Sequence, residues 1–243
     1  MAYPVIAIDG PSASGKGTIA AKVAETLQWS YLDSGALYRL TALYAKGHGA
    51  DLQDENAVAE LAAHLPVMFH SGEILLNGSN VSADIRTEEI SLLASQIAAL
   101  PKVREALLQR QRDFARASAV VADGRDMATV VFPDAVLKIF LTATAQIRAE
   151  RRAKQLGVAL NTPEFQQILS DIEKRDEKDK TRAVAPLKQA PDAYLVDSSD
   201  LTIDETVKKV LDLYHQAANN EQCAMSNEQL FSQALSGLTK FFR

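Results

Sequence analysis

A glycine-bounded loop with a lysine near its end lies close to the start of the chain, at residues 10–18, GPSASGKGT. It follows an apolar, β-branched run at residues 4–9 and precedes a stretch of helical character at residues 16–28. A loop in this position turns backbone N–H groups toward a bound anion, and the start of the helix adds partial positive charge. Strand, loop and helix in this order predict a phosphate-binding loop, in which Lys16 reaches the β- and γ-phosphates of ATP.

The loop departs from the pattern G-x-x-x-x-G-K-[ST] at its last position. Gly17 stands where a serine or threonine hydroxyl usually binds Mg²⁺, and the next hydroxyl comes at Thr18. We therefore expect Mg²⁺ to be held mainly by the phosphates of ATP and by water, with Thr18 and Asp123 as candidate protein contacts. The residues expected to surround ATP are Gly10, Pro11, Ser12, Ala13, Ser14, Gly15, Lys16, Gly17 and Thr18.

A second segment, residues 33–39, DSGALYR, carries side chains that suit another anionic ligand. Ser34 can bond a sugar or a phosphate, Tyr38 offers a flat face, and Arg39 offers a bidentate phosphate fork. A helix N-cap at Ser34, with Tyr38 and Arg39 on a solvated face, explains the same residues equally well. Taken alone, this segment leaves both interpretations open.

A third segment, residues 123–126, DGRD, comes directly after another apolar run. Gly124 lets the backbone pass close to a ligand, Arg125 can bind an oxyanion, and Asp126 can accept a hydrogen bond from an exocyclic amine. Asp123 is placed to act near Mg²⁺ or its waters. A structural arginine–aspartate pair that closes a turn is the alternative interpretation of this segment.

The stretch from residue 148 to residue 182 is charge-rich and of mostly helical character, with nine Lys/Arg against seven Asp/Glu. A mixed-charge run of this kind is usually a solvated helix face. The run stops abruptly at an arginine, however, and residues 183–187, AVAPL, then form an apolar, proline-containing segment that should pack. Two sets of cations share a helix face: Arg148, Arg151 and Arg152, and Arg175, Lys178 and Arg182.

The elements that position these residues are strands alternating with helices. Four apolar runs lack the polar alternation of a half-exposed strand, which is typical of a parallel sheet covered on both faces. We therefore predict an α/β fold with three layers, in which right-handed crossovers bring the loops after the strands to one edge. Residues 67–82, with Gly72 and Asn77-Gly78 between short extended runs, predict a small insertion of β-hairpins. The four apolar runs are residues 4–9, 119–124, 136–141 and 193–197.

Composition excludes several classes of protein. The 243 residues are 47% apolar and carry a net charge of −5, which is typical of a globular chain and argues against one that coats DNA or RNA. The single cysteine, Cys223, rules out an internal disulfide and a thiolate metal cluster. No apolar run approaches the ~18 residues of a membrane-spanning helix, and the first residues lack the features of a secretory signal. We expect a soluble, cytoplasmic protein without nucleic-acid or membrane partners.

Four motifs in the same order resemble those of bacterial cytidylate kinases (CMP/dCMP kinases), which are nucleoside monophosphate kinases. The resemblance runs from about residue 3 to residue 215. It implies an enzyme with a P-loop kinase fold that transfers a phosphoryl group from ATP, with Mg²⁺, to CMP or dCMP in pyrimidine metabolism, and it favours a monomer. The motifs are GPSASGKGT, LDSGALYR, VADGRDM followed by TVVFPDA, and RAVAPL.

The resemblance also implies roles for individual residues. The cytosine edge would be read by Ser95, Arg104 and Asp126. The ribose would be held by Arg175 and Asp179, with Tyr38 nearby and Ser34 in the same pocket. The CMP phosphate would be bound by Arg39, Arg125 and Arg182, which with Lys16 form the catalytic set. A mobile lid would carry Arg148, Arg151 and Arg152 as candidate phosphate contacts.

The domain organisation that follows is one P-loop kinase unit over residues 1–219. It would contain an insertion for monophosphate binding over about 38–105 and a lid over about 148–165. Residues 220–243 would be an extension of unknown role, with an apolar stripe of Phe231, Leu235, Leu238 and Phe242. Two other functions stay open as alternatives: another small-molecule P-loop kinase of the UMP or AMP type, and a regulatory module that hydrolyses ATP slowly.

Overall fold

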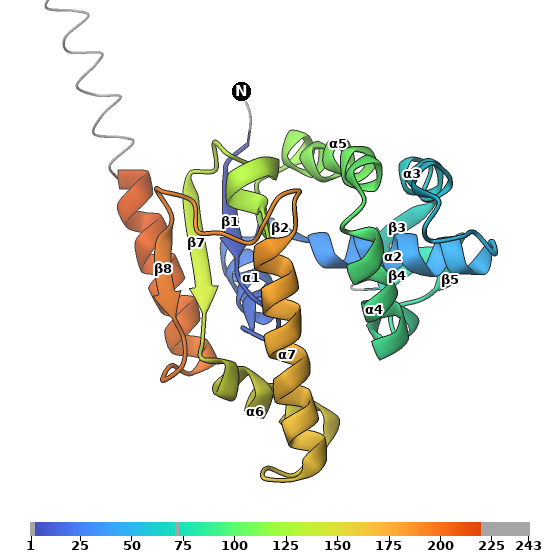
Figure 1. Cartoon of the computed structure of the whole chain (residues 1–243). Helices are drawn as coiled ribbons and strands as arrows, with labels where there is room; N and C mark the ends of the chain where they lie inside the picture. The colour runs from blue at the N-terminus through green and yellow to red at the C-terminus, as the bar shows by residue number, and fades with distance from the viewer. Residues whose placement is uncertain (1–2, 71–72, 220–243) are drawn as a thin grey trace, which may run out of the picture.

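A computed structural model describes residues 3–70 and 73–219 of the chain (Figure 1). Its centre is a parallel sheet of five strands in the order β2-β6-β1-β7-β8. The four apolar runs of the sequence form four of these strands, and β1 and β6 are buried along their whole length, as the absence of polar alternation predicts. The strands are β1 (Val5–Asp9), β2 (Ser30–Asp33), β6 (Val120–Gly124), β7 (Leu137–Thr142) and β8 (Tyr194–Asp197).

Helices cover both faces of this sheet, so the predicted three-layer α/β fold is confirmed. On one face, Ile6 and Ile8 of β1 pack with α1 (Lys16–Leu27) and with a final helix over residues 203–219, drawn in red in Figure 1. On the other face, Val5 and Ala7 pack in a cluster that includes α2 (Ser34–Gly47) and α5 (Pro101–Ala117). Successive side chains of β1 point to opposite faces of the sheet, so the core has one layer on each face.

Strand register brings the predicted loops to one edge of the sheet. Asp9, the last residue of β1, lies opposite Gly124 of β6, and Asp33 of β2 lies opposite Asp123. The strands are parallel, so the segments that follow β1, β2 and β6 leave the sheet on the same side. The expectation that the loops after the strands share one edge is confirmed.

A second, antiparallel sheet stands apart from the first, at the right of Figure 1. It consists of the hairpins predicted over residues 67–82, and its tight turn places Asn77 and Gly78 at φ values of 50° and 79°. Leu76 and Val81 pack there with Leu40 of α2. This group lies within the segment expected to bind the monophosphate. Its elements are α3 (Glu55–Ala63), β3 (Val67–His70), β4 (Glu73–Leu76), β5 (Ser79–Asn80), η1 (Asp84–Arg86) and α4 (Glu88–Ile97).

The charged stretch after residue 145 forms two helices, α6 (Ala145–Leu156) and α7 (Pro163–Thr181), which extend below the sheet in Figure 1. Thr144 and Thr162 cap their N-termini through side-chain oxygens, and Gly157 ends α6 in the left-handed conformation. Among the described residues, no helix combines the length and apolarity needed to cross a membrane. The apolar stripe predicted at residues 231–242 lies outside the described residues.

The close approach of β1 to β7 leaves no room for a side chain at Gly10. A Cβ built on Gly10 would lie 2.1 Å from the backbone oxygen of Leu141, so the Gly10→Ala variant must move backbone. We expect its free energy of unfolding to fall by about 1–3 kcal/mol or more in urea titrations.

Gly47→Ala is the matched control, because a Cβ on Gly47, at the end of α2, would meet nothing within 4 Å. It should leave stability unchanged or raise it by up to about 1 kcal/mol. Equal unfolding midpoints for the two variants would contradict the close approach at Gly10.

Candidate active site

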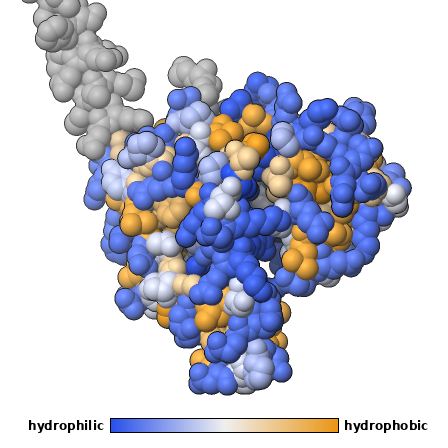
Figure 2. Space-filling model, viewed as in Figure 1, coloured by the Kyte–Doolittle hydropathy of each residue, from blue (hydrophilic) through white to orange (hydrophobic). Residues whose placement is uncertain are grey.

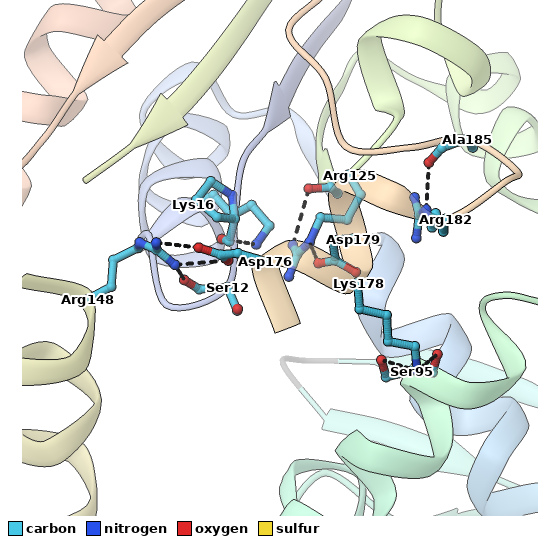
Figure 3. Close-up of polar contacts among 12 residues, drawn as sticks. Ser12, Lys16, Ser95, Arg125, Arg148, Asp176, Lys178, Asp179, Arg182 and Ala185 are labelled. Carbon is cyan, nitrogen blue, oxygen red and sulfur yellow. Dashed lines mark hydrogen bonds and ion pairs between the residues drawn. The ribbon is translucent and has the colours of Figure 1, made fainter. Parts of the chain in front are cut away.

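The loop at residues 10–18 has the geometry of an anion site. Gly15 adopts a left-handed conformation, with φ 86°, and α1 begins at the next residue. The hydroxyl oxygens of Ser12 and Ser14 are buried and have no hydrogen-bond partner among the described residues. Lys16 folds over the loop, and its Nζ donates to the Pro11 carbonyl oxygen at 3.2 Å (Figure 3). The loop thus combines two serine hydroxyls without partners, the N-terminus of a helix and a lysine, which are groups that suit a polyphosphate.

A buried carboxylate ties this loop to the segment after β6. Asp9 is 1% exposed, and its two oxygens accept hydrogen bonds from the backbone N–H groups of Met127 and Ala128, both at 2.8 Å. Burial raises the pKa of Asp9 to about 7, although the two N–H groups act in the opposite direction. The end of β1 therefore sets the position of the backbone that follows Arg125 and Asp126.

Two of the arginines assigned to the lid hold the same loop from its other side. Arg148, which is 4% exposed, donates to the Ser12 carbonyl oxygen at 3.0 Å and to both carboxylate oxygens of Asp176 (Figure 3). Arg151 donates to the carbonyl oxygens of Ser14 and Ser198 at 3.2 and 2.5 Å. In this structure both guanidinium groups bond the loop backbone, and their contact with phosphate stays a prediction.

Arg152, the third lid arginine, points elsewhere. Its guanidinium forms an ion pair with Glu88 at 2.8 Å, and Glu88 is the first residue of α4. Arg152 therefore links α6 to the group of elements around the second sheet. Its predicted contact with phosphate also stays untested.

One cavity contains every side chain that was expected to bind CMP. Figure 2 shows this face of the molecule hollowed between the body around the large sheet and the group around the second sheet, with hydrophilic residues along the hollow. Lys16 lines the same cavity, so the nucleotide loop opens into it. The expected residues that line it are Ser34, Tyr38, Arg39, Ser95, Arg104, Arg125, Asp126, Arg175, Asp179 and Arg182.

Arginine–aspartate pairs organise the walls of the cavity. Arg125 Nε and Asp179 Oδ2 are 2.7 Å apart (Figure 3), and Arg104 forms an ion pair with Asp126. Burial alone would raise the pKa of Asp179, but Arg125 and the neighbouring arginines hold it below its usual value. These pairs link α5, α7 and the end of β6 around one space.

Part of the cationic surface has no partner among the described residues. Arg39 Nε, Arg175 Nε and an NH2 group of Arg182 are buried without a hydrogen bond. Burial lowers the pKa values of Arg175 and Arg182, and the nearby guanidinium groups of Arg125 and Arg104 lower them further. Unpaired buried donors of this kind are costly, so the cluster is suited to bind an anion that brings several acceptor oxygens.

Another part of the cavity lining combines small apolar side chains with polar groups. Ala94 and Ala98 line it, and Arg104 lies 5.7 Å from the centre of the Tyr38 ring. Ser95 accepts from Lys178 Nζ through its carbonyl oxygen at 3.2 Å, across the hollow between α4 and α7 (Figure 3). A flat ring with a hydrogen-bonding edge suits this space.

Sequence analysis gave no role to Asp33, and it placed Lys178 only among the cations of one helix face. Asp33 pairs with Arg39 at 2.7 Å and caps α2 through the Ala36 N–H, and both Asp33 and Lys178 line the cavity. An aspartate directly before a helix start is a recognisable N-cap signal, so Asp33 was accessible to sequence analysis. Lys178 shows no signal beyond its helical spacing from Arg175.

The metal-binding capacity of the site is modest. Among the described residues, no cluster of three His, Cys, Asp or Glu side chains is arranged to hold a metal ion. Asp123 is 5% exposed at the end of β6 and lines the cavity beside Lys16, whereas Thr18 is exposed on α1. One carboxylate next to a polyphosphate site fits Mg²⁺, which is commonly held by one or two carboxylates, phosphates and water.

Comparison with known proteins agrees with this geometry. The cytidylate kinase family profile matches residues 6–216. Cytidylate kinase of Neisseria meningitidis serogroup C is 63% identical over 212 residues, covering 87% of this chain and 97% of that one. Cytidylate kinase of Chromobacterium violaceum is 57% identical over 216 residues, covering 89% and 97%. A gluconokinase structure from Sinorhizobium meliloti 1021 is similar in fold, with a TM-score of 0.50, 16% identity and coverage of 91% and 97%. The chain belongs to the cytidylate kinase family.

Proposed function

We propose that the protein transfers the γ-phosphoryl group of ATP to CMP and to dCMP, giving ADP and the pyrimidine nucleoside diphosphate. The observation that carries this proposal is the shared cavity, in which the nucleotide loop and Lys16 face a cluster of buried arginines. One bound ATP does not need the second cluster. Two phosphorylated ligands that meet end to end would use both.

Charge neutralisation and positioning account for the chemistry. The attacking group is a phosphate oxygen, and the second pKa of a phosphate monoester is near 6, so at neutral pH no side chain has to remove a proton. Lys16 and the loop N–H groups would bind the β- and γ-phosphates, and Arg39, Arg125 and Arg182 would bind the acceptor phosphate. Holding the two anions in line lowers the barrier of phosphoryl transfer.

Selection of cytosine would fall to the part of the cavity around Asp126, Arg104 and Ser95. Asp126 would accept a hydrogen bond from the exocyclic amine of cytosine, while Arg104 and Ser95 would donate to its ring acceptors. Uracil has a carbonyl in place of that amine, so its oxygen would face the Asp126 carboxylate with no proton to donate. Arg175 and Asp179 would hold the ribose, with Tyr38 and Ser34 beside it.

Mg²⁺ would supply part of the charge neutralisation, with Asp123 as its protein contact, directly or through water. The reaction would belong to pyrimidine nucleotide metabolism in the cytoplasm. A single chain supplies both the nucleotide loop and the acceptor cluster, which supports action as a monomer. Residues 38–105 would act as the monophosphate-binding part, and α6 with the start of α7 as the lid.

An acceptor panel tests the proposed reaction. With ATP and Mg²⁺, we expect ADP release in a coupled assay to depend on CMP or dCMP and to be much slower with UMP or AMP. Lys16→Ala should keep the fold and lose about 10²–10³-fold or more in turnover, because a cation at the transferring group is removed. Lys22→Ala is the control, since Lys22 is an exposed residue of α1. ADP release independent of any monophosphate would refute the proposal.

Asp126→Ala tests the assignment of base selection. The ratio of kcat/KM for CMP over UMP should fall by about 10-fold or more, because a buried hydrogen bond specific to cytosine is lost. Asp126→Asn keeps one acceptor oxygen, so its ratio should lie between those of the native protein and of Asp126→Ala. Asp113→Ala, on the exposed side of α5, should leave the ratio unchanged. An unchanged ratio in Asp126→Ala would show that Asp126 does not read the base.

Nucleotide binding should be coupled to proton uptake at Lys16. Burial, together with the charge of Arg125, lowers the pKa of Lys16 in the free protein. The β-phosphate of ADP raises it again, so a lysine that is partly deprotonated at pH 8 takes up a proton on binding. Calorimetry of ADP binding at pH 8 in HEPES and Tris, two buffers of different ionisation enthalpy, should give different apparent enthalpies. Lys16→Met should abolish that difference, and equal buffer dependence in both proteins would contradict the assignment.

A further inference from the structure

The space beside Gly17 is already occupied from another strand. A Cβ built on Gly17 would lie 3.3 Å from the hydroxyl oxygen of Tyr31 and 3.9 and 4.0 Å from the two carboxylate oxygens of Asp123. Position 17 is where the common phosphate-binding loop carries a serine or threonine. Apart from the two neighbours of Gly17 in the chain and the backbone of its own helix, the group nearest to a Cβ at that position is the Tyr31 hydroxyl of β2.

The Tyr31 hydroxyl is bonded to the candidate metal contact. It donates to Asp123 Oδ1 at 2.7 Å, from β2 to the neighbouring strand β6. A phenol carries its proton at neutral pH and a carboxylate oxygen has none, so the tyrosine hydroxyl is the donor of this bond. Tyr31 is 36% exposed, whereas its acceptor Asp123 is buried, with 5% of its surface exposed.

Rigid support of a carboxylate matters at a metal site. An aspartate side chain can rotate, and a hydrogen bond to one oxygen restricts which oxygen faces the ion. Loss of such an outer hydrogen bond typically costs 10–100-fold in metal affinity. Asp123 is the one carboxylate that we assign to Mg²⁺, so its orientation decides what the protein contributes to the metal.

We propose that Tyr31 is a positioning residue for Mg²⁺: its hydroxyl holds the carboxylate of Asp123, which is the protein contact to the ion in place of the hydroxyl that Gly17 lacks. Tyr31 would not ligate the ion, and it would act only by holding the Asp123 carboxylate. The inference rests on the proposed function in one respect, the binding of a metal–nucleotide complex in the loop. It also makes Gly17 and Tyr31 interdependent, because a side chain at position 17 would meet the tyrosine hydroxyl.

Tyr31→Phe tests the proposal directly, with Mn²⁺ and ADP as the probe. Electron paramagnetic resonance measures free Mn²⁺, and we expect the affinity of the enzyme–ADP complex for Mn²⁺ to fall about 10-fold. The affinity for ADP without metal and the KM for CMP at saturating Mg²⁺ should not change. Tyr194→Phe is the matched control, since it removes a phenol hydroxyl from the half-exposed end of β8. Native Mn²⁺ affinity in Tyr31→Phe, or an equal loss of metal-free ADP binding, would overturn the proposal.

A single and a double variant test whether positions 17 and 31 depend on each other. Gly17→Ser should bind Mn²⁺–ADP more weakly than the native protein, because its Cβ meets the Tyr31 hydroxyl at 3.3 Å. In the double variant G17S/Y31F that hydroxyl is gone, and the serine hydroxyl should restore Mn²⁺ affinity above that of Tyr31→Phe. Additive losses would show that the two positions act independently. The Mn²⁺ measurement does not depend on turnover, so it stays informative even if the acceptor panel refutes CMP as substrate.

Discussion

Crowded positive charge in a buried space is the constraint on which this active site depends. Like charges within a cavity of low dielectric repel one another, and guanidinium donors without acceptors are costly. Aspartates compensate part of this charge, as the pairs of Arg125 with Asp179 and of Arg104 with Asp126 show. The rest of the charge faces the cavity, where two phosphorylated ligands would neutralise it. Binding energy and catalytic stabilisation would then come from the same groups.

The parallel sheet makes this crowding possible. Register places Asp9 opposite Gly124 and Asp33 opposite Asp123, so three chain segments reach one edge together. Asp9 also fixes the segment that follows β6, because it accepts hydrogen bonds from the backbone N–H groups of Met127 and Ala128. Site residues that directly follow several strands are held in position more precisely than residues on one long loop would be.

The helices α6 and α7 connect the two halves of the site. Arg148 bonds the nucleotide loop at Ser12 and also bonds Asp176 of α7. On the same helix, Arg175 and Asp179 line the acceptor cavity. If nucleotide binding shifts the loop at Ser12, the movement would therefore be transmitted through α7 to Arg175 and Asp179. This arrangement suits a reaction in which both ligands must be present before transfer.

Sequence by itself determined the nucleotide loop, the apolar strands, the hairpins of the second sheet and the helical charged stretch, because each follows from residues close together in the chain. Resemblance to a family, and not spacing, supplied Ser95 and Arg104 as site residues. Tertiary structure decided which groups pair: Asp33 with Arg39, Lys178 with Ser95, and Tyr31 with Asp123. Two of these three contacts join residues more than eighty positions apart, so no helical or strand periodicity in the sequence can predict them. The neighbouring strands β2 and β6 bring Tyr31 to Asp123, and the packing of α7 beside α4 brings Lys178 to Ser95.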